Sequence, residues 1–538
     1  MTRSSTPLPT PFDSPHPWTR LQGGLLGLVI AVGLCLGWLG RSAEISTGGD
    51  EATYIQLSES LRSGHYRDEY ILGAPLHAHY PPGMPAWLLA VRSLPGDDLD
   101  VPRAANLLLL GLAALLLADG LRRIGYGWAG IGAAAVFLWN PLLLEIGATL
   151  HSEALYIVLS LLATWASLRS RDRPGPGWPA VAGAAAAAGF LTRSVGLGLL
   201  AGIGVAALAA RRWRFASGLA VAGGAVVAGW FLYLRSAIPQ TVANTYVADV
   251  ALVAQSGAGL VDRVMNSLRV YLGQVLPDLL ELPMASGTMV DNLATLLILG
   301  GLGLWGWVIL WRRWAAGAAT VAAGAGILML WVWPVDRLML PLLPWLAATL
   351  MIGAAAIGRR LPSPLSRGLP LAVGLVLAGL ALRAAVPQAV RAMQCEWPDQ
   401  YAGPGCVAEE ERAFVAAVRQ LNEVLPPGAV ISSAKPSTTW YFARRSVVPV
   451  EILRNSPRLE PSSSGVLHPS GFTHLLLTPF TTLERNLIAP ILRDHCAQLG
   501  LVHQAELGAL VLGPRGPGAA DACAELADFQ ERFPPRDN

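Results

Sequence analysis

Long apolar segments alternate with short polar connections over most of the chain. A helix that crosses a bilayer needs about 20 mainly apolar residues, and hydropathy gives about eleven candidate segments. These segments are Leu25–Leu39, Ala104–Leu121, Trp128–Trp139, Ala154–Leu168, Pro179–Phe190, Val195–Ala210, Phe215–Tyr233, Leu293–Trp311, Ala315–Trp333, Leu338–Ile357 and Leu369–Ala385. Some are short, so certain pairs could be re-entrant hairpins. The pattern predicts an all-α polytopic membrane domain.

The pattern changes after residue 386. Apolar residues recur at helical spacing over Glu409–Leu425, and a second helix is expected over Leu483–Leu499, ending before Gly500. Short apolar runs beside turn residues predict strands, which are expected at 429–431, 446–452, 474–477 and 509–512. Alternating helices and strands indicate a small α/β domain over residues 387–538.

Composition places the chain among membrane proteins. Hydrophobic residues make up 53% of the chain and charged residues 14%, whereas soluble proteins carry about 25% charged residues. The net charge of +3 gives no indication of a nucleic-acid partner. Residues 1–22 form a polar tail rich in Pro and Ser. The stretch Ser42-Ala43-Glu44 resembles a cleavage site, but we interpret the apolar segment before it as a retained span.

Arginine clusters indicate an orientation. They follow the even-numbered spans, at 122–123, 169–173, 211–214, 312–313 and 359–367. All of them therefore fall on one side, which the positive-inside rule makes the cytoplasm, together with the tail 1–22. The transmembrane domain is expected over 23–386. The segments expected outside are the first outer loop 41–103, the connections 140–153, 192–193, 235–289 and 334–337, and the α/β domain after 387.

The first outer loop has helical patterns of its own. Apolar spacing predicts short interfacial helices at Glu51–Leu61, with Gly64 after its end, and at Pro85–Leu94. Similar helices are expected in the long loop, at 246–253 and 260–276.

The chain contains five cysteines. Cys35 lies in the first apolar segment and is expected to be a packed thiol. The other four lie in the C-terminal region, where an extracytoplasmic location would allow disulfides. Sequence proximity favours the pairs Cys395–Cys406 and Cys496–Cys523, although connectivity cannot be deduced from the sequence.

Asp50 and Glu51 begin the first interfacial helix. Acidic residues are common at this position because they complement the helix dipole. Alternatively, one carboxylate is a general base that accepts the proton of an attacking hydroxyl group. The low dielectric constant at a membrane boundary would then raise the pKa of that carboxylate toward a useful value.

Glu153 follows Ser152 at the outer start of the fourth span. It either complements the helix dipole behind a Ser152 cap, or acts as a second carboxylate that binds a metal, orients Asp50 or holds an acceptor. Glu145 on the same loop is a further candidate. A lone His151 fits a polar interfacial residue better than a ligand.

Two arginines lie on the outer side, against the positive-inside pattern. Arg193 lies between two apolar segments, where a guanidinium needs an anionic partner. That partner is either a protein carboxylate or a phosphate. Arg337 either pairs with Asp336 or binds a lipid-linked phosphate, which its two parallel donors would suit.

His77, His79 and Tyr80 precede Pro81-Pro82-Gly83, in which the two prolines fix an extended loop. His79 or Tyr80 could contact a phosphate or a sugar, but ordinary interfacial residues have the same composition. The sequence contains no H-E-x-x-H, P-loop, G-x-S-x-G or Cys/His zinc pattern.

Several short motifs resemble one known family. In chain order they are Asp50-Glu51, the helix ending at Gly64, Tyr80-Pro81-Pro82-Gly83, Ser152-Glu153-Ala154-Leu155-Tyr156, Thr192-Arg193, and Asp336-Arg337-x-x-x-Pro341-x-x-Pro344. Together with the expected order of spans and outer loops, these motifs resemble the C-type fold of integral-membrane glycosyltransferases. The most similar in style are bacterial relatives of the protein O-mannosyltransferases and of the aminoarabinose transferases that modify lipid A. The resemblance covers most of residues 20–390.

The resemblance implies an inverting transferase that takes a sugar from a polyprenyl-phosphate donor at the outer membrane boundary. The acceptor would be a hydroxyl group of a lipid, a glycan or a protein. Asp50 then corresponds to the catalytic base, Glu51 to its support and Glu153 to the acid of the second loop. The candidate ligands of the donor phosphate are Arg193, Arg337, His79 and Tyr80. In the aminoarabinose transferases a lysine precedes the two prolines, whereas this chain has Tyr80 there.

Other expectations stay open. Asp50, Glu51 and Glu153 offer hard oxygen ligands and could bind a divalent metal. The main alternative function is a transporter or flippase of a lipid-linked sugar. Such proteins place charges near the bilayer midplane and contain repeated halves, whereas these charges gather at one face and no repeat is visible. A sensor or an assembly scaffold would not need the carboxylates and arginines to converge.

Overall fold

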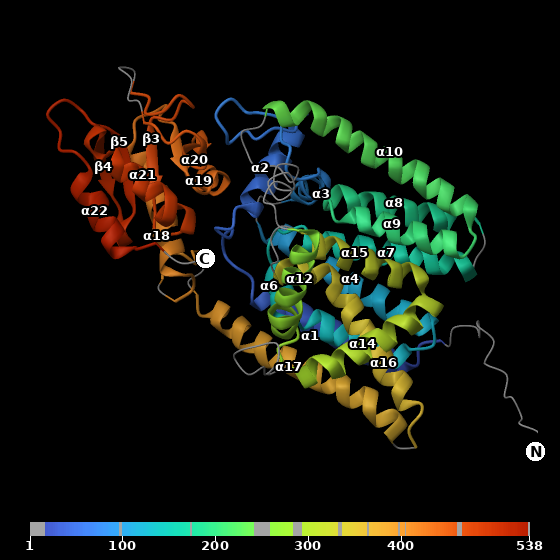
Figure 1. Cartoon of the computed structure of the whole chain (residues 1–538). Helices are drawn as coiled ribbons and strands as arrows, with labels where there is room; N and C mark the ends of the chain where they lie inside the picture. The colour runs from blue at the N-terminus through green and yellow to red at the C-terminus, as the bar shows by residue number, and fades with distance from the viewer. Residues whose placement is uncertain are drawn as a thin grey trace, which may run out of the picture.

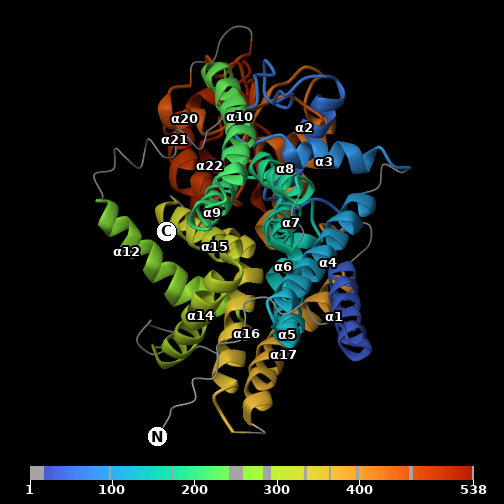
Figure 2. The same cartoon turned by 90° about the vertical axis from the view of Figure 1, so that its right-hand side faces the viewer.

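The computed structural model describes residues 17–95, 99–172, 175–240, 259–282, 293–331, 336–362, 365–395, 399–403, 405–459 and 465–535. Figure 1 shows a large bundle of helices and, at its upper left, a smaller lobe formed by the chain after α17. The turned view in Figure 2 has the same lobe at the top, beside α2 and above α16 and α17. The expected boundary between a membrane domain and a C-terminal domain, at residue 387, stays a prediction.

The expected apolar segments are helical. Helices satisfy their own backbone polar groups, which a bilayer requires, and small residues let neighbouring helices approach closely. The helices of the bundle are α1 (Arg20–Leu39), α4 (Asp100–Arg123), α5 (Gly127–Leu138), α6 (Pro141–Gly147), α7 (Glu153–Asp172), α8 (Gly177–Thr192), α9 (Gly196–Ala209), α10 (Trp213–Ala237), α14 (Leu293–Arg313), α15 (Ala315–Leu330), the 3-10 helix η3 (Asp336–Leu342), α16 (Leu343–Gly358) and α17 (Leu365–Met393).

The number of clear spans is smaller than the eleven expected. Within the described residues, six helices are long and apolar enough to cross a membrane. A seventh span results if α5 and α6, which are bent by 66°, count as one. α9 and α15 are apolar but shorter. The chain is a multi-pass membrane protein, and its exact number of crossings and its orientation stay predictions.

The first outer loop contains the two expected short helices, α2 (Asp50–Arg62) and α3 (Gly83–Arg92). Residues 51–58 of α2 are all buried, because α2 packs against α3 and against α19 of the C-terminal lobe. It is therefore an internal helix instead of one lying on an open interface. In the long loop, α12 (Leu260–Val270), a π-helical turn and α13 (Leu276–Leu279) occupy the expected 260–276, while 246–253 lies outside the described residues.

The C-terminal lobe is the expected α/β domain, built on a five-stranded sheet of order β2-β1-β3-β5-β4. β1 is parallel to β2 and β3, and β5 is antiparallel to β3 and β4. Leu475 and Leu477 of β3 pack into one apolar cluster and Leu476 into another, so both faces of the sheet are covered. The strands are β1 (Ile431–Ser433), β2 (Val447–Pro449), β3 (His474–Leu477), β4 (Leu499–Gln504) and β5 (Leu510–Pro514).

Helices cover this sheet. They are α18 (Glu409–Val424), α19 (Pro436–Ala443), α20 (Ile452–Asn455), α21 (Ala489–Asp494) and α22 (Cys523–Arg532). Two sequence predictions are wrong here. The helix expected over Leu483–Leu499 ends at Asp494, and Leu499 instead begins β4. The strand expected over 446–452 covers only Val447–Pro449, because the chain turns into α20.

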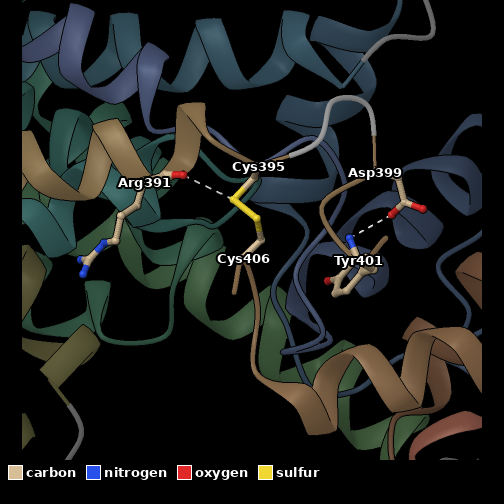
Figure 3. The surroundings of a disulfide bond; sticks show 5 residues. All are labelled: Arg391, Cys395, Asp399, Tyr401 and Cys406. Atoms are coloured by element: carbon tan, nitrogen blue, oxygen red, sulfur yellow. Dashed lines mark hydrogen bonds between the residues drawn. A yellow bond between two sulfur atoms is a disulfide. The ribbon is translucent and has the colours of Figure 1, made fainter. Parts of the chain in front are cut away.

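Both expected disulfides are present, Cys395–Cys406 and Cys496–Cys523. The first lies just after α17 and closes the loop that leads into the lobe (Figure 3). The prediction for Cys35 is wrong, since this thiol is exposed on α1. Its position on the outer face of an apolar helix allows a small, weakly polar side chain without a packed site.

Glu484 gives a testable pH dependence of the lobe. Burial raises the pKa of Glu484 to about 7, although Thr478 and Thr481 donate hydrogen bonds to its carboxylate. In an unfolded chain the pKa is about 4.3. The folded lobe therefore binds the proton more tightly, and the stabilisation is complete at low pH and is lost as the pH rises toward 7.

We expect the free energy of unfolding of the lobe to decrease by about 3 kcal/mol between pH 4 and pH 8 through this group. Glu484→Gln should remove that part of the pH dependence in denaturant unfolding curves, and Glu506→Gln, at an exposed position of the same lobe, should not. Identical pH dependence in wild type and Glu484→Gln would contradict the assignment.

Candidate active site

Four sequence candidates lie at the ends of four separate helical elements. Asp50 is the first residue of α2 and Glu153 the first of α7. Arg193 directly follows α8, and Arg337 lies in η3. The structure brings their side chains into one cluster, although Asp50 and Arg337 are 287 residues apart.

Arg337 bridges the two carboxylates of this cluster. Its Nη2 donates to Asp50 Oδ2 at 2.5 Å, and its Nε lies 2.7 Å from Glu153 Oε1. Arg193 Nη1 lies 2.5 Å from the same Glu153 oxygen. The Glu153 side chain is fully buried, and two guanidinium groups balance the two acids. A buried carboxylate requires such pairing.

The Glu153 contacts are ion pairs more than aligned hydrogen bonds. Within the described residues, neither oxygen of its carboxylate has a hydrogen-bond partner of good geometry, although two arginines lie close to one of them. The negative charge of Glu153 is thus balanced, and its two oxygens can still accept hydrogen bonds.

Tyr80 is the second partner of Asp50. Its hydroxyl donates to Asp50 Oδ1 at 2.6 Å. Burial alone would raise the pKa of Asp50, but the charge of Arg337 and the hydrogen bonds from Tyr80 and Arg337 outweigh burial and hold this pKa well below its usual range. The expectation of a raised pKa is therefore wrong for this arrangement, because it omitted the bridging guanidinium.

Sequence inspection missed two members of the site. Ser152 Oγ accepts from Arg193 Nη1 at 3.0 Å and from the Tyr54 hydroxyl at 3.3 Å. The rings of Tyr54 and Tyr80 are 4.9 Å apart. Tyr54 lies one helical turn after Asp50, so its position on the same face of α2 was the available signal.

These residues border a cleft that is partly open to solvent. Its polar wall includes Tyr54, Tyr80, Ser152, Arg193 and Arg337, and its apolar wall comes mainly from α15 and η3. Among the described residues, Asp50 and Glu153 are not part of the lining, although both contact Arg337. A ligand in the cleft would thus meet the arginines and the tyrosines before it meets the carboxylates.

Other candidates lie elsewhere. Glu51 is buried, and its carboxylate accepts from the backbone N–H groups of Ser46 at 2.6 Å and Leu150 at 2.8 Å, so it joins two loops. His79 packs edge-on against Tyr80, with ring centroids 4.5 Å apart.

The two remaining candidates, Glu145 and His151 of the connection 140–153, have partners within the protein. Glu145 accepts from Gln388 at 2.9 Å. His151 is buried beside Thr149, with 2.5 Å between its Nδ1 and the hydroxyl oxygen. Their hydrogen-bond partners thus lie outside the Asp50–Arg337 bridge, although His151 is close enough to interact electrostatically with Asp50.

The acidic residues do not fit a metal site in this arrangement. Glu51 is directed toward backbone N–H groups, and the Arg337 guanidinium stands between Asp50 and Glu153. The described residues contain no group of three or more His, Cys, Asp and Glu side chains that could hold a metal ion.

Two backbone features fix the loop that carries Tyr80. A Cβ atom on Gly83 would lie 2.6 Å from the Leu191 carbonyl oxygen, so only glycine allows the start of α3 to pack against the end of α8, beside Arg193. His77 Nε2 accepts from the Tyr80 backbone N–H at 2.7 Å. His77 Nδ1 lies 2.6 Å from Asp68 Oδ1 and must carry the proton.

His77→Leu is expected to lower the free energy of unfolding by about 1 to 3 kcal/mol, because it leaves the buried Asp68 carboxylate and the Tyr80 N–H without their partner. Thermal unfolding of the purified protein in detergent measures this change. His65→Leu, at an exposed position of the same loop, should have little effect. Equal melting temperatures for His77→Leu and wild type would refute the assigned role.

Comparison with known proteins agrees with this architecture. A family model described as dolichyl-phosphate-mannose-protein mannosyltransferase matches residues 79–233. A search of curated proteins gives no match. ArnT from Cupriavidus metallidurans, solved bound to undecaprenyl phosphate, has a TM-score of 0.55 and 15% identity, over 92% of this chain and 99% of that chain.

A second structural relative is the archaeal oligosaccharyltransferase AglB from Archaeoglobus fulgidus, in complex with an inhibitory peptide and a dolichol-phosphate. It has a TM-score of 0.56 and 12% identity, over 88% of this chain and 71% of that chain. At such identities the likeness concerns the fold. The family match includes Tyr80, Glu153 and Arg193 but neither Asp50 nor Arg337. Residues 79–233 thus resemble the mannosyltransferase family model, and the chain has the fold of ArnT and AglB.

Proposed function

We propose that the chain is an inverting glycosyltransferase that moves a sugar from a polyprenyl-phosphate donor to a hydroxyl group at the outer face of the cytoplasmic membrane. The transferred sugar is a hexose or a pentose, and the acceptor is a lipid, a glycan or a protein. The observation that carries the proposal is the bridge formed by Arg337 between Asp50 and Glu153 at the wall of a cleft.

The charges suit a phosphate leaving group. Arg193 and Arg337 line the cleft, and a guanidinium offers two parallel donors to phosphate oxygens. As the bond between the anomeric carbon and the phosphate oxygen breaks, its electron pair stays on that oxygen. The two arginines stabilise the negative charge that develops there.

Donor binding also prepares the base. In the donor-free protein Arg337 holds the Asp50 carboxylate in its weakly basic form. A phosphate in the cleft competes for the same guanidinium, and a carboxylate that loses a cationic partner becomes more basic. Asp50 then accepts the proton of the acceptor hydroxyl, while the acceptor oxygen forms a bond to the anomeric carbon from the side opposite the phosphate.

Glu153 keeps the second arginine in place. Its fully buried carboxylate remains paired with Arg193 when Arg337 turns toward the phosphate. Tyr80, which donates to Asp50, remains to orient the carboxylate. Tyr80 stands before the two prolines, where aminoarabinose transferases have lysine, and its hydrogen bond to Asp50 supports a role at the base. His79 packs against its ring from the side.

The proposed topology follows the arginine clusters. Residues 1–22 lie in the cytoplasm, 23–386 form the membrane domain, and 387–538 form an extracytoplasmic domain. α17 runs to Met393, so the boundary lies within the last turns of this helix. The two disulfides of the C-terminal region support an oxidising compartment.

The direct test is transfer from a radiolabelled polyprenyl-phosphate sugar by purified protein in lipid nanodiscs, with candidate acceptors supplied as pools of lipids, glycans and proteins. We expect labelled product and an equal amount of released polyprenyl phosphate. Hydrolysis of the donor without an added acceptor would also count in favour, since water can replace the acceptor hydroxyl.

The same donor in sealed proteoliposomes tests the alternative. Movement of intact lipid-linked sugar between leaflets, with no cleavage under any acceptor condition, would identify a transporter and overturn the proposal.

A further inference from the structure

The segment that leads into Asp50 is held by the C-terminal lobe. The Tyr401 hydroxyl donates to the Ile45 carbonyl at 2.7 Å, and the Thr47 hydroxyl donates to Glu411 at 2.7 Å. Arg419 joins Glu44 to Asp399, with 2.6 Å to each. Lobe residues therefore contact the chain at Glu44, Ile45 and Thr47, shortly before Asp50.

A disulfide supports two of these contacts. Figure 3 shows Asp399 and Tyr401 in the loop that the Cys395–Cys406 disulfide closes, with the Tyr401 N–H donating to Asp399. On the other side, Arg103 of α4 donates to the carbonyls of Ala43 and Glu44 at 3.2 and 2.8 Å. Arg103 of the membrane domain therefore holds the backbone at Ala43 and Glu44. Beyond this point the lobe contacts the chain as far as Gly49, and Glu51 additionally binds the Ser46 N–H.

The lobe contact nearest to Asp50 comes from Ser437 on α19. Ser437 Oγ donates to the Gly49 carbonyl at 3.0 Å. The same carbonyl accepts from the Thr53 N–H at 3.0 Å and from the Thr53 hydroxyl at 2.9 Å. Gly49 has φ of +100°, which other residues rarely adopt. Ser437 thus fixes the peptide unit from which Asp50 enters α2.

The far end of the same loop is attached to the lobe as well. The Leu72 N–H donates to the Val447 carbonyl at 3.0 Å, and the Val447 N–H donates to the Tyr70 carbonyl at 2.8 Å. Ile71 pairs in parallel with Val447. Residues 70–72 therefore extend the edge of the sheet at β2. The same loop then carries Tyr80, whose hydroxyl donates to Asp50. Asp68 contacts His77, and His77 accepts from the Tyr80 backbone N–H, so these contacts join the attached part of the loop to Tyr80.

We propose that the C-terminal lobe is a positioning element for the transfer reaction, and that Ser437 is a positioning residue that acts through the Gly49 carbonyl to keep the Asp50 carboxylate between Tyr80 and Arg337. This inference rests on the function proposed above. A displacement of about 1 Å in a reacting group can reduce a rate by about 100-fold. Ser437 is not among the described residues that line the cleft, so donor binding should not depend on it.

The test compares Ser437→Ala with two other variants. Ser437→Thr keeps the hydroxyl group. Thr473→Val removes a hydroxyl group that bonds to the Val430 backbone between β1 and β3, inside the lobe and away from the loop. For each protein, the number of binding sites for undecaprenyl phosphate is measured by calorimetry, and kcat is expressed per site.

We expect Ser437→Ala to lower kcat per site by about tenfold or more with unchanged affinity for undecaprenyl phosphate, which is a partial loss of the orientation effect. Ser437→Thr should recover most of the rate. Thr473→Val should lower the melting temperature but leave kcat per site unchanged. Hydrogen exchange should increase at residues 45–52 in Ser437→Ala only.

Two results would overturn the inference: kcat per site of Ser437→Ala within twofold of wild type, or equal losses in Ser437→Ala and Thr473→Val. Both results require an active wild-type enzyme. If wild type itself fails to cleave the donor, the proposed function fails instead, so the two failures can be told apart.

Discussion

Asp50→Asn is expected to lower kcat by a factor of about 10² to 10⁴, the usual contribution of a general base. The amide has the shape of the carboxylate and can still accept from Tyr80, so the local structure should persist. Donor affinity should stay the same or increase, because Arg337 no longer has to leave a carboxylate to bind the phosphate. Steady-state transfer and calorimetric binding of undecaprenyl phosphate measure the two quantities separately.

Glu59→Gln is the matched control for this variant. Glu59 lies on the same helix and pairs with Arg92 at 3.5 Å, away from the cleft. Its loss should leave kcat within twofold of wild type. An Asp50→Asn enzyme that retains more than a third of the wild-type kcat would remove Asp50 from the mechanism.

Arg337→Gln is expected to lower kcat/KM for the donor by a factor of about 10² to 10³, the typical cost of losing one preorganised donor to a developing oxyanion. It should also change the pH dependence. Without the guanidinium, burial raises the pKa of Asp50 from the depressed level of the wild-type protein. The acid limb of the kcat/KM profile, which reports the free enzyme, should move to higher pH.

Arg92→Gln serves as the control for this variant, since Arg92 lies in the first outer loop, which also carries Asp50, and pairs with Glu59. It should leave both the rate and the acid limb unchanged. If Arg337→Gln keeps the wild-type kcat/KM, or loses rate with no movement of the acid limb, the bridge between Arg337 and Asp50 has no part in the reaction.

The candidate site could be located from the sequence because its members follow from topology. Asp50, Glu153, Arg193 and Arg337 each follow or precede an expected apolar segment, and the expected alternation of spans places these positions on one face. The pairing could not be predicted. The sequence left open whether Arg337 pairs with its neighbour Asp336 or with an anion further away. Its guanidinium pairs with Asp50 and Glu153, and the Asp336 carboxylate accepts from the Arg337 backbone N–H.

The role of each residue in the site was harder to predict from the sequence than the location of the site. Glu51 and Asp50 are adjacent, so they point to different sides of α2, and Glu51 meets backbone N–H groups of two loops. The sequence places Tyr54 one turn after Asp50 and Ser152 at the start of a motif, but neither position indicates a contact with Arg193. Only the packed arrangement makes Ser152 a partner of Arg193.

The fold was predictable where the apolar periodicity is strong, and less predictable at an edge strand of the sheet and in a short helix. The long apolar helices and β3 were expected at nearly their observed positions. β4 was missed because it is an edge strand with a half-exposed pattern, and its Gly500 looked like a helix stop although it lies opposite Gly513 in the sheet. α19 was missed because it is short, begins at Pro436 and is interpretable as a loop.

The pairing of residues 70–72 with β2 has a consequence for handling the C-terminal lobe. β2 is the outermost strand of its sheet, and a segment encoded far upstream covers its free side. A fragment that begins after α17 would leave the backbone N–H and C=O groups of Val447 unpaired. Open strand edges of this kind recruit other chains, so the excised lobe should be prone to self-association, whereas the intact protein conceals that edge within its own first outer loop.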